Sequence, residues 1–240
     1  MAMRILITND DGINSPALMK LAKWATKLGE VTVVAPKIEQ SGKSHAIDFS
    51  RKMEIKKVDF IEGCEAWYMD STPADCIRFA MIAFEGKFDL VFSGMNKGYN
   101  VGQSIAYSGT VGAACEATHF GLKAIAFSTD ITALEPAFEA LDMVYEYISE
   151  NALLEYTDVL NVNIPDKGIK GFSITRRGGP FYTDQFVLQD DGTYMHIGEP
   201  VVADWNDISY DLDAVMNGYV SITPLSADKT NLEAYNKMRS

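Results

Sequence analysis

Two adjacent carboxylates follow the first apolar segment of the chain. Residues 4–8 read as a strand that stops at Asn9-Asp10-Asp11-Gly12. Neighbouring carboxylates repel each other, so a cation between them is a natural solution, and oxygen ligands of this kind suit Mg²⁺ or Mn²⁺. Asn, Asp and Gly are also common turn residues, so an ordinary turn is the competing interpretation. The position at the end of a first parallel strand favours the metal site.

Two later polar loops offer further oxygen ligands. Ser41 begins the stretch Ser-Gly-Lys-Ser a few residues after Pro36, and Asn96 lies in the stretch 93–100, SGMNKGYN. If the preceding segments are parallel strands, both loops open at the same edge of the sheet as Asp10 and Asp11. Ser41 and Asn96 could then complete an all-oxygen metal site. Taken alone, each loop is better explained as a turn.

A fourth segment combines helix-capping residues with a small residue. Ser108, Gly109 and Thr110 open a predicted helix. Ser and Thr are good N-cap residues, and a small helix start also presents free N–H groups and a positive dipole end to a phosphate. Phosphate binding and plain capping explain this segment equally well.

Several other segments resemble known functional motifs but lack a residue that the motif requires. Gly42-Lys43-Ser44 resembles the end of a phosphate-binding P-loop, but Lys37 stands where that motif has its first glycine. Asn9 occupies the place of the nucleophilic Asp in phosphoaspartyl phosphatases, and an amide cannot form the acyl phosphate. We expect structural roles for the histidines, which show neither a metal-binding spacing nor a triad-like arrangement: His45, His119 and His196.

The spacing of apolar residues predicts the elements that would position these loops. Strands are expected at 4–8, 30–36, 88–93, 123–128 and 158–164. Helices are expected at 18–28, 75–83, 111–121 and 134–148. This alternation predicts an α/β fold with a doubly wound, mostly parallel sheet whose ligands bind at the carboxyl ends of the strands.

Two stretches break the alternation. Residues 45–70 contain strand-like segments, and residues 166–215 are rich in Gly, Asp and aromatic residues without a helical period. We expect the latter to form β-hairpins or an extended arm outside the main sheet. A single domain, 1–240, is the simplest organisation, with a core at about 1–165 and C-terminal arm and oligomerisation elements at about 166–240.

Composition limits the classes of partner and compartment. The chain has 240 residues and a formal net charge of −12, which argues against nucleic-acid polymers and anionic membranes as partners. Its three cysteines show no C-x-x-C spacing, and the N-terminus lacks the pattern of a signal peptide. No apolar run approaches the roughly 20 residues of a membrane helix. The sequence therefore predicts a cytoplasmic protein.

Taken together, these segments resemble the SurE family of stationary-phase survival proteins, which are metal-dependent 5′/3′-nucleotidases. The matching segments occur in family order across nearly the whole chain: 5–17, 35–47, 71–77, 89–102, 107–117, 160–165 and 218–225. The chain departs from the family pattern at Ser71, where a Gly is usual, and at Tyr210, where a Thr is expected. These changes spare the predicted metal ligands and bear on substrate preference and arm geometry.

The resemblance implies a Rossmann-like core and a specific assignment of the loops. One divalent cation per subunit, Mg²⁺ or Mn²⁺, would be held by Asp10, Asp11, Ser41 and Asn96. The helix start would be the phosphate cradle, formed by Ser108, Gly109 and Thr110. Family members form homodimers or homotetramers with exchanged C-terminal arms, which fits the irregular stretch after residue 165.

The resulting hypothesis is hydrolysis of nucleoside 5′-monophosphates by a metal-activated water, with 3′-monophosphates as an open alternative. Asp10 or Asp11 would orient or deprotonate the water. The phosphoryl oxygens would be steadied by Asn9, Asn96 and the N–H groups around Gly109 and Thr110. A non-catalytic nucleotide sensor, or a phosphatase for short polyphosphate or other phosphomonoesters, is the alternative. The sequence selects no aromatic residue to stack on a base, although Tyr99, Tyr107 and the arm offer candidates.

Overall fold

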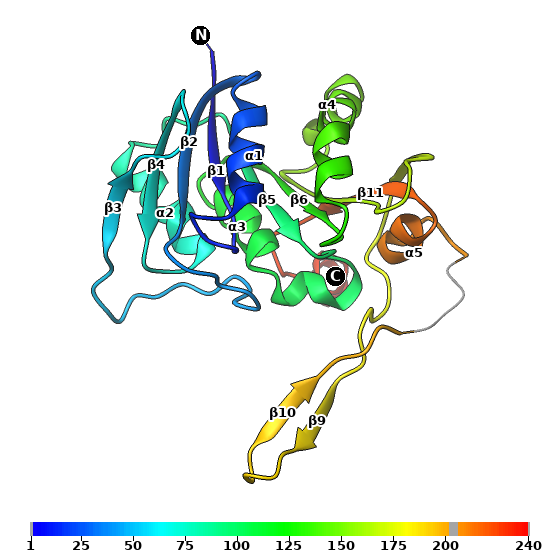
Figure 1. The fold of residues 1–240 in the computed structure, drawn as a ribbon. Coiled ribbons are helices and arrows are strands. Elements are labelled where there is room, and N and C mark those ends of the chain that lie inside the picture. The colour runs from blue at the N-terminus through cyan, green and yellow to red at the C-terminus, as the bar shows by residue number, and fades with distance from the viewer. Residues whose placement is uncertain (1, 202–205, 240) are drawn as a thin grey trace.

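The computed structural model describes residues 2–201 and 206–239. A nine-stranded sheet forms the centre of the described chain (Figure 1). Its strands, in spatial order, are β3 (Ile55–Val58), β4 (Cys64–Met69), β2 (Gly29–Pro36), β1 (Met3–Thr8), β5 (Leu90–Lys97), β6 (Lys123–Thr129), β7 (Val159–Ile164), β11 (Tyr219–Leu225) and β8 (Gly171–Ile174). The predicted α/β class is confirmed.

The strands from β4 to β7 run parallel to one another. Strand β3 is antiparallel to β4, and β11 is antiparallel to β7 but parallel to β8. The chain passes from β1 outward to β2 and later returns to place β5 on the other side of β1. The strand order therefore reverses between β1 and β5. In an open α/β sheet this reversal leaves a crevice at the carboxyl ends of the two strands, where ligands bind.

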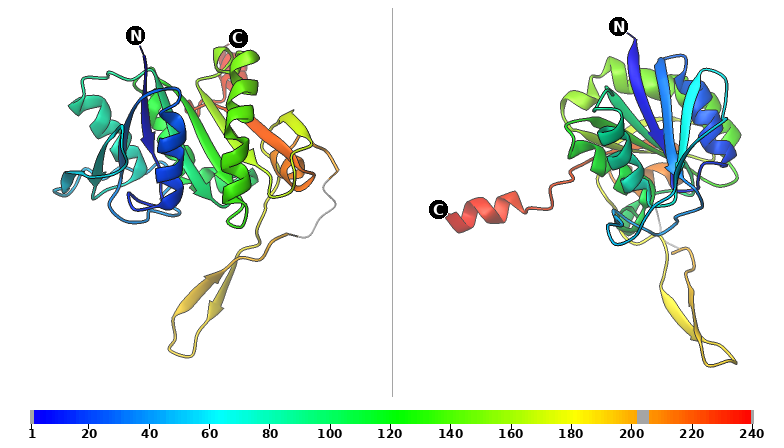
Figure 2. Two further views of the ribbon diagram at one scale, coloured as in Figure 1. Left: turned by 45° about the horizontal axis from the view of Figure 1, so that its top comes forward. Right: turned by 90° about the vertical axis from the view of Figure 1, so that its left-hand side faces the viewer.

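Helices cover both faces of the sheet (Figures 1 and 2). Helices α1 (Pro16–Ala25) and α4 (Leu134–Glu150) contribute to one hydrophobic cluster, and α2 (Pro73–Ala83) and α3 (Gly109–Thr118) contribute to a second. Successive side chains of a strand point to opposite faces, so in β5 Phe92 joins the first cluster and Val91 the second. Both faces are therefore buried, as a parallel sheet requires.

Two helices begin at side-chain caps, and the one at Ser108 was predicted. At α2 the Thr72 hydroxyl accepts a hydrogen bond from the backbone N–H of Asp75 at 3.2 Å, and Pro73 is the first helical residue. At α3 the Ser108 hydroxyl accepts one from Val111 N–H at 3.1 Å. Each capped start holds the preceding loop at the carboxyl edge of the sheet.

Helix α1 is shorter than predicted. The apolar spacing runs to residue 28, but the helix ends at Ala25 and Gly29 begins β2. A Cβ atom on Gly29 would lie 1.9 Å from the carbonyl oxygen of Met3, so β1 and β2 approach too closely there for any other residue. Residues 26–28 form the turn between the helix and this strand contact, which periodicity does not detect.

The expectation that residues 166–215 form only β-hairpins or an extended arm outside the main sheet is wrong for two elements. Strand β8 joins the sheet beside β11, where the hydroxyl of Thr175 lies 2.8 Å from that of Ser221 and 2.7 Å from that of Thr223. Helix α5 (Asp211–Met216) packs against β11. A six-residue helix and a four-residue strand are too short to show a clear period in the sequence.

The remaining C-terminal segments project from the sheet. Strands β9 (Gln185–Leu188) and β10 (Tyr194–Ile197) form a separate antiparallel hairpin, and α6 (Leu232–Arg239) extends away from the rest of the chain (Figure 2). Short 3₁₀ helices lie at η1 (Gly102–Tyr107) and η2 (Leu153–Glu155). Within the described ranges, no helix has both the length and the apolar character to cross a membrane.

The packing predicts a large cost for truncating Phe92. Its ring is fully buried and contacts the rings of Trp24, Phe127 and Tyr145. Phe92→Ala should lower the free energy of unfolding by about 3–5 kcal/mol, measured by urea denaturation, because it leaves a cavity. Phe49→Ala, at a side chain that is 89% exposed, is the matched control and should change it by less than about 0.5 kcal/mol. Equal losses in the two variants would contradict this description of the core.

Candidate functional site

The two carboxylates lie where the strand order reverses. Asp10 and Asp11 directly follow β1 and line a cavity of about 580 Å³. Ser41 from the loop after β2, Asn96 from the end of β5 and Ser108 at the start of α3 line the same cavity. Residues far apart in the sequence thus meet at the carboxyl edge of the sheet.

Asp10 is buried against the start of α3. Its Oδ1 accepts a hydrogen bond of 2.7 Å from the Thr110 hydroxyl. A Cβ atom on Gly109 would lie 3.0 Å from the Cβ atom of Asp10, so only a glycine leaves adequate room for this contact. Burial raises the pKa of Asp10 above its ordinary value, although the hydrogen bond from Thr110 opposes the rise. Burial therefore disfavours the charged form of Asp10, and the contact with Thr110 offsets this in part.

Asp11 is in a similar position. Its Oδ1 lies 3.5 Å from the Lys97 ammonium, and its Oδ2 is buried without a hydrogen-bond partner. Burial raises the pKa of Asp11 to about 6; Lys97 lowers it in part, and Asp10 adds to the rise. A buried carboxylate oxygen without a partner is costly, and a bound cation would satisfy it.

Backbone contacts fix the two neighbouring loops. The N–H of Gln40 donates to the carbonyl of Asp10 at 2.7 Å, which holds the loop carrying Ser41 against the first loop. The register of β5 with β6 shifts between Ser93 and Asn96, and such an irregularity can redirect a side chain. The amide nitrogen of Asn96 donates to the carbonyl of Gly98 at 2.8 Å, which leaves the amide oxygen for a ligand.

A buried amide network supports the loop after β5. The carbonyl of Asn100 accepts hydrogen bonds from Asn161 at 2.8 Å and Asn163 at 3.0 Å, both on β7. The Asn100 amide also donates to the Ser128 hydroxyl at 2.8 Å. Sequence reasoning missed this network. The segment 160–165, LNVNIP, contains two asparagines in an otherwise apolar strand. Because a buried amide needs a hydrogen-bond partner, these asparagines could have indicated the network.

Three residues expected to contact phosphate have other contacts. The Asn9 amide accepts from Gly12 N–H and donates to Gly12 carbonyl, each at 3.2 Å, so it shapes the turn and does not line the cavity. Gly109 and Thr110 contact Asp10. Of the expected phosphate cradle, Ser108 lines the cavity directly.

The cavity also has lining residues that the sequence did not single out. Glu39 adds a third carboxylate, and its side chain accepts a hydrogen bond of 2.6 Å from the Ser41 hydroxyl. Lys97 places a positive charge beside Asp11. Ile131 and Tyr182 come from later parts of the chain. Lys97, next to Asn96, and Glu39, two residues before Ser41, lie within the matching segments, whereas Ile131 and Tyr182 lie outside them.

The donor set fits a hard divalent cation. Two carboxylates, one with an unpartnered buried oxygen, face the same cavity as a hydroxyl and an amide oxygen. Mg²⁺ and Mn²⁺ prefer oxygen ligands of these types.

Comparison with known proteins agrees with this arrangement. The family model described as "Survival protein SurE" matches residues 5–184. The chain belongs to the SurE family. A relative from Clostridium beijerinckii named "5'-nucleotidase SurE" is 38% identical, over 95% of each chain. One of the same name from Thermosipho melanesiensis is 36% identical, over 96% of this chain and 94% of the relative.

A solved structure extends the likeness to three dimensions. The SurE protein of Aquifex aeolicus has a TM-score of 0.83 with this chain at 34% identity, and the match covers 98% of both chains. The sheet described above, including its later strands, is therefore the fold of the SurE family.

Proposed function

We propose that this protein hydrolyses nucleoside 5′-monophosphates in a metal-dependent reaction. The supporting observation is that Asp10, Asp11, Ser41 and Asn96 converge on one cavity at the reversal point of the sheet. Membership of a family whose relatives carry the name "5'-nucleotidase SurE" supports the choice of substrate class. We propose that 3′-monophosphates are also hydrolysed at this cavity.

The four converging residues would hold one Mg²⁺ or Mn²⁺ ion. When bound, such an ion neutralises charge on a phosphoryl oxygen and lowers the pKa of a water molecule. Asp10 is fixed by Thr110 and by the close approach of Gly109, so it offers a carboxylate oxygen in a defined place. Asp11 offers its unpartnered oxygen.

The chain itself would bind the phosphate and orient the attacking water. The hydroxyl of Ser108, the ammonium of Lys97 and the start of α3 give the cavity hydrogen-bond donors and local positive potential. Asp10 or Asp11 would accept a hydrogen bond from the water and take up its proton. In this proposal, the role of Asn9, Gly109 and Thr110 is to hold the carboxylates in position.

The aromatic residues around the cavity differ in their freedom to bind a base. The hydroxyl of Tyr99 accepts from the backbone N–H of Asp166 at 2.8 Å, so Tyr99 is engaged within the fold. Tyr107 is 66% exposed, and Tyr182 of the arm is 47% exposed. We therefore assign base stacking to Tyr107, with Tyr182 at the rim.

The projecting segments support an oligomeric assembly. The hairpin exposes apolar side chains on both of its strands: Phe186, Val187, Leu188, Tyr194 and Met195. Helix α6 buries none of its residues. Exposed apolar surface of this kind is typical of a subunit interface, so a homodimer or homotetramer with exchanged C-terminal arms is part of this proposal.

The cytoplasm is the proposed compartment. The cysteines of the chain, Cys64, Cys76 and Cys115, are free thiols, which suits a reducing environment. Nucleoside monophosphates, the proposed substrates, would be met there.

Replacement of Asp11 tests the reaction. Asp11→Asn keeps the size of the side chain and removes its charge, so release of phosphate from AMP with Mn²⁺ should fall by about 100-fold or more. EDTA should abolish wild-type activity, and excess Mn²⁺ should restore it. Asp59→Asn, at an exposed carboxylate away from the cavity, is the control and should retain full activity.

The other outcomes separate the alternatives. Full activity of Asp11→Asn, or of the wild type in EDTA, would contradict the metal-dependent mechanism. Nucleotide binding without hydrolysis would identify a sensor. Phosphate release from short polyphosphate alone would change the substrate class.

Truncation of Tyr107 tests the binding of the base. Tyr107→Ala should raise KM for AMP about 10-fold, because stacking on a base contributes about 1–3 kcal/mol. KM for glycerol phosphate, which has no base, should stay unchanged. Tyr156→Ala, at a side chain that is 85% exposed and does not line this cavity, is the matched control. An equal rise in KM for both substrates would argue against base stacking.

Charged substitutions in the hairpin test the assembly. Phe186→Asp combined with Leu188→Asp should reduce the mass measured by light scattering to that of a single chain, because buried charges oppose an apolar interface. Ile82→Asp, at an exposed apolar side chain on α2, is the control and should leave the mass unchanged. An oligomer of undiminished mass would show that the hairpin is not the interface.

A further inference from the structure

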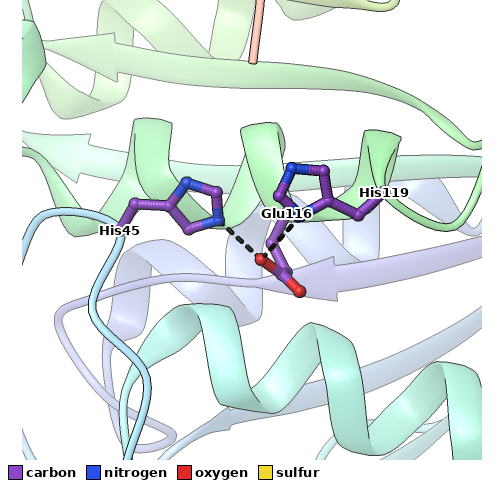
Figure 3. Close-up of side chains that lie close together, drawn as sticks. All are labelled: His45, Glu116 and His119. Atoms are coloured by element: carbon purple, nitrogen blue, oxygen red, sulfur yellow. Dashed lines mark hydrogen bonds and ion pairs between the residues drawn. The ribbon is translucent and has the colours of Figure 1, made fainter. Parts of the chain in front are cut away.

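The folding of the chain brings two of its histidines together with a buried glutamate. His45 lies in the loop after β2, Glu116 in α3 and His119 at the C-cap of α3. The Nε2 atom of His45 lies 2.6 Å from Oε2 of Glu116, and the Nδ1 atom of His119 lies 3.3 Å from the same oxygen (Figure 3). One donor atom from each of the three residues lies within 4.8 Å of the others.

We propose that His45, Glu116 and His119 form a second metal site, selective for Zn²⁺ over Mg²⁺. Two imidazoles and one carboxylate make a nitrogen-rich donor set that suits Zn²⁺ and related transition metals. The candidate site at Asp10 and Asp11 offers oxygen atoms alone and suits Mg²⁺ or Mn²⁺. The two sites would therefore take different ions.

The glutamate is prepared to act as a ligand. Its side chain is 3% exposed, and Arg78 of α2 donates to its Oε1 at 2.9 Å. The other carboxylate oxygen, Oε2, faces the nitrogen atoms of the two histidines. Burial opposes ionisation of Glu116, but the hydrogen bonds from His45 and Arg78 outweigh it, so the pKa of the carboxyl lies below its ordinary value. A hydrogen-bonded, charged carboxylate is the usual form of a metal ligand.

The backbone around His45 is fixed independently of the cluster. The N–H of Ser44 donates to the carbonyl of Tyr107 at 2.9 Å, and its hydroxyl donates to that of Ala106 at 2.6 Å. On the other side, the Thr72 hydroxyl donates to the carbonyl of Ala46 at 2.7 Å. A Cβ atom on Gly112 would lie 2.4 Å from the Ser44 carbonyl oxygen, so the glycine lets this loop rest on α3.

The remaining positions around the ion would face open space. His45 and His119 line a cavity of about 840 Å³ that is also bordered by Asp158 and Asp228. Zn²⁺ commonly takes four ligands, so water from this cavity can complete the set. The site also lies at the C-terminal end of α3, where the helix dipole favours a cation.

The proposed site is separate from the candidate catalytic cavity but joined to it through the fold. Helix α3 has 10 residues and is about 15 Å long, with Asp10 against its first turn and His119 at its end. His45 follows Ser41 in the same loop. A bound ion would clamp that loop to α3 and thereby restrain both the loop with Ser41 and the helix that positions Asp10.

Metal titration of the full-length protein tests this proposal. After EDTA treatment and removal of the chelator, Zn²⁺ is titrated by calorimetry in excess Mg²⁺, and Co²⁺ replaces Zn²⁺ to give a visible absorption band. The wild type and Asp11→Asn should each bind one Zn²⁺ per chain with equal affinity. His45→Asn and His119→Asn should each weaken binding by at least about 10-fold, because even outer partners of a metal site contribute that much.

The third histidine provides the matched control. His196 lies on the hairpin, 2.8 Å from Asp184, and His196→Asn should leave zinc binding unchanged. His119 is 54% exposed, so its replacement should leave the fold intact, which circular dichroism would verify. The proposal is overturned if the wild type binds no Zn²⁺, if the affinity survives both histidine substitutions, or if binding is lost only in Asp11→Asn.

Discussion

The burial of two carboxylates where the strand order reverses is the constraint on which the rest of the site depends. Asp10 and Asp11 follow β1, between β2 and β5, where burial raises the pKa of both and Oδ2 of Asp11 has no hydrogen-bond partner. Thr110 and Lys97 each compensate only in part. The surrounding loops place further oxygen atoms at the same edge of the sheet, a donor set that a divalent cation would suit.

Helix α3 connects the features that surround this constraint. Its first turn presses against Asp10, its middle carries the loop from Ser44 through the close approach of Gly112, and its end holds the cluster of Glu116 and His119. Helix α3 packs into the second hydrophobic cluster, so these three contacts share one support. The same element thus positions the candidate catalytic carboxylates and the proposed zinc ligands.

The net charge of −12 does not describe the electrostatic potential inside the cavity. An acidic chain repels nucleic-acid polymers and anionic membranes, whereas a small phosphate ester responds to the potential inside one cavity. Lys97 and the start of α3 contribute positive potential there, and the proposed cation would add to it. Net charge therefore constrains the large partners, and the loops at the sheet edge constrain the substrate.

The sequence by itself determined the alternation of strands and helices, the capped starts of α2 and α3 and the loops that carry Asp10, Ser41 and Asn96. These depend on local periodicity and turn chemistry, which neighbouring residues express directly. Only the tertiary structure decided that Asn9 holds a turn, that β8 joins the main sheet and that His45 meets Glu116, 71 positions away in the chain. Such contacts depend on how closely separate elements approach, and no local pattern of residues records that distance.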